Sequence, residues 1–146
     1  GAAKTRRRWI VIGCREGTIR NFQTVRPRTV REAFGDLRDN WGLMRSSPET
    51  LARLAVATTE DWVPMNGQYR NMIRLRWDEP APTVCNPKKV YMVHPSECRN
   101  ISLAEAAALQ GFPPEYIWHG SDTAIAQMIA NAMPSEMAAA VAGALS

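Results

Sequence analysis

The sequence specifies one helix at both of its ends, and this helix constrains how the rest of the chain can fold. Ser102 and Glu105 have the spacing of a capping box, in which a hydroxyl and a carboxylate satisfy free amides of the first helical turn. Gly111 can take the left-handed conformation that ends a helix, and Pro113 prevents the helix from continuing. The sequence therefore predicts a helix over 103–110.

Two further helices are predicted before this one. Thr29 and Glu32 have the spacing of a second capping box, which predicts a short helix that reaches about residue 37. Ser47 is followed directly by a proline, which is the usual order of an N-cap and a first helical residue. A helix is therefore expected near 48–57.

Two helices are also predicted after it. Asp122 can cap a helix that ends near residue 130, with Asn131 in a left-handed conformation at its end. Pro134 stands where the first residue of another helix is expected, and the Ala-rich stretch behind it predicts a final helix to about Leu145.

Three apolar segments predict strands. Residues 8–13 (RWIVIG) are apolar on both faces, as in a sheet that is covered on both sides. Residues 73–77 alternate apolar and arginine side chains, which is typical of a half-buried strand. Residues 90–93 (VYMV) predict a third, short strand. Helices and short strands together indicate a mixed fold.

Positive charge is concentrated at one end of the chain. Residues 1–31 hold nine Lys or Arg and a single acid, Glu16, so their net charge is +8, whereas the remainder carries −4. Such a basic block suits contact with the phosphates of nucleic acid, because it releases counterions; the alternative is a solvated basic arm. No stretch approaches the ~20 apolar residues that span a bilayer, so no membrane contact is expected.

The cysteines point away from metal binding. Cys14, Cys85 and Cys98 are far apart, and no Cys or His pair has the spacing of zinc ligands, so no metal site is predicted. Three unpaired cysteines fit a reducing compartment such as the cytoplasm.

Two sequence blocks near the C-terminal end match, in the same order, blocks of a known family. Residues 99–113 (RNISLAEAAALQGFP) match the pattern Arg-x-Leu-Thr-x-Arg-Glu-x-Ala-Arg-Leu-Gln-Gly-Phe-Pro, and residues 128–134 (MIANAMP) match Gly-Asn-Ala-Val-Pro. Together they resemble the last two sequence blocks of DNA cytosine-5 methyltransferases. The resemblance implies that Asn131 and Ala132 border the S-adenosylmethionine pocket. It implies structural roles for Glu105, Leu109, Gln110, Gly111, Phe112 and Pro113.

Two earlier segments resemble the same family in the same order. Residues 4–13 (KTRRRWIVIG) are similar to a block that reads Gln-x-Arg-x-Arg before an apolar strand, although Lys4 replaces the Gln. By resemblance, Arg8 lies beside O2 of the flipped cytosine, and Arg6 supports it or binds phosphate. Residues 74–84 (RLRWDEPAPTV) resemble a run that lies late in the target-recognition region of the family. The resemblance thus implies DNA contacts for Arg6, Arg74, Arg76, Thr83, Val84 and Arg99.

The resemblance also implies a fold and a domain organisation. The expected fold class is α+β, with an irregular small target-recognition domain over 18–120. Residues 1–17 would supply a strand, and residues 121–146 would supply the C-terminal helices. Together these two segments would complete a doubly wound α/β methyltransferase domain. Double-stranded DNA is the implied substrate, and the implied context is restriction-modification in the cytoplasm of a prokaryotic or phage-infected cell.

The catalytic nucleophile of the family is not found in this sequence. In the family it follows a proline, in Pro-Cys-Gln, whereas Gly13, Val84 and Glu97 precede the three cysteines here. Glu-Asn-Val is absent, and no glycine-rich loop follows an early strand. We therefore expect the nucleophile and most of the cofactor site to lie upstream of Gly1, in a catalytic half or subunit that is the chain's partner. The chain alone is predicted not to methylate DNA.

Two other interpretations remain. Ala104 and Ala108 stand where the family usually has arginines, and Ala130 stands where it has glycine. These departures leave open a non-catalytic DNA-binding or regulatory module derived from the family. A generic basic domain with chance matches is the third interpretation, and the ordered spacing of the blocks argues against it.

Overall fold

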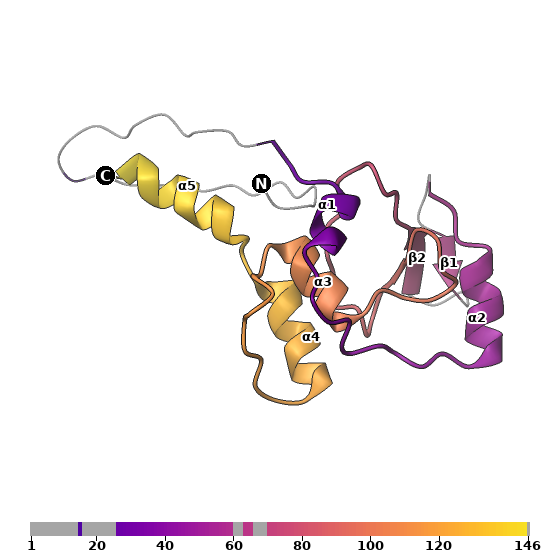
Figure 1. The fold of residues 1–146 in the computed structure, drawn as a ribbon. Helices are drawn as coiled ribbons and strands as arrows, with labels where there is room; N and C mark the ends of the chain where they lie inside the picture. The colour runs from indigo at the N-terminus through magenta and orange to yellow at the C-terminus, as the bar shows by residue number, and fades with distance from the viewer. Residues whose placement is uncertain (1–14, 16–25, 60–62, 66–69, 146) are drawn as a thin grey trace.

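The computed structural model describes Arg15 and residues 26–59, 63–65 and 70–145 (Figure 1). The predicted strand at 8–13 and the residues Arg6 and Arg8 lie outside this part. In chain order, the described elements are α1 (Val30–Gly35), α2 (Pro48–Ala55), β1 (Val63–Met65), β2 (Arg70–Arg74), β3 (Tyr91–Val93), α3 (Leu103–Gln110), α4 (Asp122–Asn131) and α5 (Ser135–Leu145). None of these helices is long and apolar enough to cross a membrane.

Both predicted capping boxes are confirmed. At α1 the Thr29 hydroxyl accepts from the Glu32 amide at 3.2 Å, and the Glu32 carboxylate accepts from the Thr29 amide at 2.7 Å. The hydrogen bond from the Thr29 amide is the main cause that lowers the pKa of Glu32 to about 2, and the hydrogen bond from Arg26 is the next largest. At α3 the Ser102 hydroxyl accepts from the Glu105 amide at 3.0 Å, and Gly111 ends the helix with φ +85°.

Of the other predicted helix ends, one agrees with the sequence expectation and the rest differ in detail. Ser47 caps α2 as predicted, but α4 is capped by Ser121, whose hydroxyl accepts from the Ala124 amide at 3.3 Å, rather than by Asp122. Asn131 is the last helical residue, not a left-handed one, because the chain leaves α4 through extended Ala132. Pro134 precedes α5, since its carbonyl is the first acceptor of that helix.

The described strands form one small sheet in the order β1-β2-β3. β1 is antiparallel to β2 and β3 is parallel to it, with Ile73 opposite Met92 and Arg74 opposite Val93. The strand predicted at 73–77 therefore ends earlier than expected, at Arg74, because its partner β3 ends at Val93. The predicted alternation of burial nevertheless continues past the strand, with Leu75 buried and Arg76 exposed.

Two hydrophobic clusters hold these elements together. The smaller one packs α2 on the sheet through Leu54, Ala57, Met72 and Val93. The larger one joins α1, α3 and α4 to the loops around them, and it includes Val30, Ala33, Leu103, Leu109, Ile125 and Ile129. α3 lies in the middle of this cluster, and α5 projects away from it (Figure 1). The described part is thus a mixed arrangement of helices and a small sheet, consistent with the α+β class.

The close approach of Gly42 to α3 gives a first prediction. Gly42 has φ +69°, and a Cβ atom there would lie 2.6 Å from Cβ of Leu103, which is fully buried. We expect Gly42→Ala to lower the free energy of unfolding by about 1–2 kcal/mol from backbone strain alone, and by more through the clash. Gly35→Ala is the matched control, because nothing lies within 4 Å of its added methyl. Urea unfolding of both variants checks this, and equal stabilities would contradict it.

Candidate functional site

The carboxylate of Glu105 is the centre of a buried polar network. Its side chain is 3% exposed. Oε1 accepts from Nδ2 of Asn40 at 3.0 Å and from Nη2 of Arg99 at 2.7 Å, while Oε2 accepts from Nη1 of Arg99 at 2.7 Å and from the Ser102 amide at 2.8 Å. One carboxylate therefore caps α3 and binds a guanidinium through two parallel hydrogen bonds, the strongest geometry for this pair.

Arg99, predicted to contact DNA, is fully engaged within the protein. Besides Glu105, its Nε donates to Oε2 of Glu97 at 2.8 Å and its Nη1 to the Asn100 carbonyl at 3.2 Å. The hydrogen bond to Glu105 is the main cause that raises the pKa of Arg99 above its ordinary value. All three of its nitrogens thus have acceptors within the protein, two of them on buried Glu105, and the side chain is positioned as a structural group.

His94 lies against this network and was not identified from the sequence. Its ring stacks on Phe34 with centroids 5.7 Å apart and meets the edge of Trp77 at 5.2 Å. Nδ1 accepts from the Glu97 amide at 3.1 Å, so a proton on the neutral ring is carried by Nε2, 3.9 Å from Glu105 Oε1. Burial is the main cause that lowers the pKa of His94, and the charge of Arg99 acts in the same direction.

Arg74 also serves the fold. Its guanidinium donates to the carbonyls of Leu54 at 3.1 Å, His94 at 2.9 Å and Glu97 at 3.1 Å. Leu54 lies in the last turn of α2, where its carbonyl also accepts from the Ala57 amide at 3.2 Å and where a cation is favourable. Arg74 therefore ties the end of α2 to the loop after β3.

The remaining residues of the 74–84 run are divided between surface and core. Arg76 is exposed and pairs with Glu79 at 2.8 Å, whereas Val84 is buried in the larger cluster and Thr83 is half-buried. A shallow cavity of about 270 Å³ opens here, lined by Thr59, Arg74, Arg76, Glu79, Pro80 and Pro82. Among the predicted DNA contacts in this run, Arg76 is the one whose charge faces solvent.

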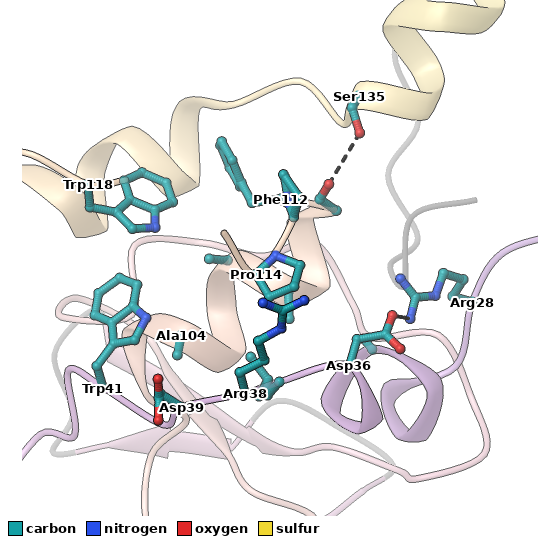
Figure 2. A pocket seen from close by; sticks show the side chains of 16 residues that line it. Arg28, Asp36, Arg38, Asp39, Trp41, Ala104, Phe112, Pro114, Trp118 and Ser135 are labelled. Carbon is teal, nitrogen blue, oxygen red and sulfur yellow. Dashed lines mark hydrogen bonds and ion pairs between the residues drawn. The ribbon is translucent and has the colours of Figure 1, made fainter. Parts of the chain in front are cut away.

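The first of the two closing blocks, residues 99–113, lines part of a groove of about 600 Å³ between α1, α3 and the start of α5 (Figure 2). Trp41 and Trp118, with ring centroids 6.2 Å apart, lie on one side, and the Arg28–Asp36 ion pair lies on the other. Leu109 and Gln110 are buried beneath it. The groove itself is lined in part by Ala104, Ala107, Ala108, Gly111, Phe112 and Pro113.

The end of α4 carries the predicted cofactor-binding residues. Asn131 is exposed, and its Oδ1 accepts from Nε2 of Gln127 at 2.9 Å. Within the described part of the chain, its Nδ2 has no hydrogen-bond partner. An exposed amide with a free donor fits the acceptor-rich groups of S-adenosylmethionine, which are a carboxylate, ribose oxygens and ring nitrogens. Half-buried Ala132 follows it as the cap of α4.

Comparison with known proteins identifies the family. The family model described as C-5 cytosine-specific DNA methylase matches residues 36–146, and this chain belongs to that family. Type II methyltransferase M.PspPI of Psychrobacter sp. is 41% identical over 75 residues, covering 49% of this chain and 18% of that protein. Type II methyltransferase M.MthTI of Methanothermobacter thermautotrophicus is 26% identical over 165 residues, covering 94% of this chain and 50% of that protein. The chain thus spans half or less of the length of these relatives.

A solved structure supports the fold. It is a crystal structure of a protein described as a DNA modification methyltransferase encoded within a prophage (E. coli). It superposes with a TM-score of 0.58 at 23% identity, covering 70% of this chain and 27% of that one. The similarity shows that the described elements adopt an arrangement found in a larger protein of this kind.

The buried network gives a stability prediction. Glu105→Ala would leave Arg99, Asn40 and the Ser102 amide without their acceptor, so we expect a loss of about 3 kcal/mol or more in the free energy of unfolding. Glu49→Ala removes an exposed i,i+4 pair with Arg53 and should cost less than about 0.5 kcal/mol. Denaturant unfolding measures both. Comparable losses would show that the network does not hold the fold.

The lowered pKa of His94 gives a pH prediction. The folded state resists a proton that the unfolded chain accepts near pH 6.5, so stability is present above that pH and declines as the pH falls below it. We expect His94→Gln to flatten the slope of unfolding free energy between pH 7 and 5. His119→Gln, at an exposed position, is the control and should keep the slope. An unchanged slope in His94→Gln would refute the assignment.

Proposed function

We propose that this chain supplies the DNA-recognition and cleft-completing half of a DNA cytosine-5 methyltransferase, which transfers a methyl group from S-adenosylmethionine to C5 of cytosine in duplex DNA. The observation that carries the proposal is the family match over 36–146 in a chain whose cysteines all lack a preceding proline. In the family a thiolate adds to C6 of the extruded cytosine. The catalytic half, whether a separate subunit or a preceding part of the same chain, would contribute that thiolate from its Pro-Cys-Gln.

The residues of this chain bind and orient DNA in the proposed enzyme. A cytosine must leave the base stack before its ring can react, and a guanidinium is suited to hold a carbonyl oxygen or a phosphate. We assign Arg8 to O2 of the extruded base and Arg6 to support it. Arg76 and Thr83 contact the duplex, whereas Arg74, Val84 and Arg99 act through the internal contacts that hold the recognition loops in place.

The cofactor supplies the methyl group, and this chain supplies one wall of its pocket. Asn131 offers a free amide donor at the end of α4, and Ala132 continues that wall. The catalytic half would provide the remaining walls. In this proposal residues 18–120 form the target-recognition domain, while residues 1–17 and 121–146 complete the catalytic domain.

Exposed apolar side chains support a protein partner. Ile117 is 75% exposed, and Tyr116, Met128 and Met133 are each more than two-fifths exposed. Exposed apolar side chains that gather into a patch mark an interface, and the neighbours Tyr116 and Ile117 are candidates for such a surface. Covering it is the proposed task of the catalytic half.

A second candidate function follows from the alanines of α3. Ala104 and Ala108 line the groove where the family usually has arginines, which favours a non-catalytic DNA-binding or regulatory module. Such a module would bind duplex DNA in a salt-dependent way, and no catalytic half would restore methyl transfer.

Complementation separates the two functions. We expect methyl transfer to DNA only when this chain is mixed with a polypeptide that bears Pro-Cys-Gln and the family's N-terminal blocks, with a labelled methyl donor. Cys→Ala at that partner's nucleophile should abolish transfer, whereas Cys85→Ala and Cys98→Ala in this chain should leave it within about twofold. Methyl transfer by this chain alone would refute the proposal that a catalytic half is needed. Duplex binding without methyl transfer in any mixture would favour the non-catalytic DNA-binding module.

A further inference from the structure

A chain of side-chain amides connects the loop after Val84 to Asn131. The Lys88 amide donates to Oδ1 of Asn86 at 2.9 Å. Nδ2 of Asn86 donates to Oε1 of Gln127 at 3.0 Å, and Nε2 of Gln127 donates to Oδ1 of Asn131 at 2.9 Å. We call these three side chains the amide relay.

The orientation of every amide in the relay follows from its first member. A backbone N–H can only donate, so the Asn86 atom that faces Lys88 must be the oxygen. Asn86 then has only its NH₂ group for Gln127, which must accept with Oε1 and donate onward with Nε2. Asn131 therefore receives that bond on Oδ1. Its NH₂ group remains, and it faces outward as a donor.

The geometry of α4 places the relay along one helix face. Gln127 and Asn131 are four residues apart, so their side chains are neighbours on the helix surface. The same face is also contacted one turn earlier, where Nζ of Lys88 lies 3.4 Å from Oγ1 of Thr123. The loop that contains Asn86 and Lys88 is thus fastened to α4 at two successive turns.

We propose that Asn86 and Gln127 are positioning residues, which fix the Asn131 amide so that it presents a hydrogen-bond donor to an acceptor atom of S-adenosylmethionine. This inference rests on the proposed function, which supplies the identity of the ligand. Asn86 follows Val84 closely in the chain, so the relay also ties the proposed DNA-recognition segment to the proposed cofactor wall. Neither Asn86 nor Gln127 belongs to a block that carries the family resemblance.

Gln127→Glu tests the relay, because a carboxylate accepts from Asn86 but cannot donate to Asn131. Asn131 must then turn its NH₂ group toward Glu and present oxygen outward. In the complemented enzyme we expect the KM for S-adenosylmethionine to rise roughly 2- to 10-fold, the worth of one hydrogen bond, with kcat and DNA affinity unchanged. Asn131→Asp should give the same shift. Gln127→Met removes the relay without adding charge and should also raise KM.

Thr123→Val is the matched control, since it removes the Lys88 contact one turn away and leaves the relay intact. Its KM should equal that of the parent chain. A second readout, independent of activity, is the NMR signal of the side-chain amides in this chain alone. We expect slow hydrogen exchange for the Gln127 NH₂ group, and a downfield shift of the Asn131 NH₂ group in Gln127→Glu.

The outcomes separate this inference from the proposed function. An unchanged KM in Gln127→Glu, or a Gln127 NH₂ group that exchanges as fast as a solvated amide, overturns the relay and leaves the proposed function standing. Protected amides together with no cofactor binding in any complemented sample overturn the proposed function, and with it the ligand assigned to Asn131.

Discussion

The structure depends on the placement of one negative charge in the middle of its core. Glu105 lies on α3, which is buried on nearly all sides, and a carboxylate in such a position is tolerated only when it is paired and hydrogen-bonded. Here Arg99, Asn40 and the Ser102 amide provide those bonds. The same interactions fix where α3 begins and hold against it both the distant Asn40 segment and the Arg99 segment that precedes it, so the cap, the core and these segments are positioned together.

Because α3 is fixed in this way, its far end can organise the proposed cofactor side. Gln110 donates a hydrogen bond to the Ile129 carbonyl of α4, and Ser135 at the start of α5 donates to the Gly111 carbonyl at 3.2 Å. The left-handed turn at Gly111 brings these elements to the end of α3. One helix therefore contacts the segments of Asn40 and Arg99 at its beginning and α4 and α5 at its end, so it connects the proposed recognition side to the proposed cofactor side.

The features that could be predicted from the sequence are those set by near neighbours. Both capping boxes and the glycine end of α3 depend on residues a few positions apart, and they appear as expected. The α4 cap did not, because Ser121 and Asp122 are equally plausible from sequence and only the backbone path selects Ser121. His94 and Asn86 escaped prediction for another reason: their partners are brought to them by the fold, and Asn86 and Gln127 are 41 positions apart in the chain. Arg74 was identified from the sequence, but its role could not be predicted. A sequence pattern reveals an arginine and does not show that its N–H groups donate to carbonyls within the protein.

The groove beside α3 gives the last constraint on what this surface binds. The groove is lined by two arginines, Arg28 and Arg38, and by two aspartates, Asp36 and Asp39, so it has no excess positive charge. An interface with phosphates requires such an excess. With Ala104 and Ala108 on α3, the indole rings of Trp41 and Trp118 line the groove, whereas arginines at these positions would add charge to it. A neutral groove with aromatic walls is suited to apolar protein segments. This chemistry fits the proposed contact with a catalytic half better than it fits a contact with DNA phosphates at this face.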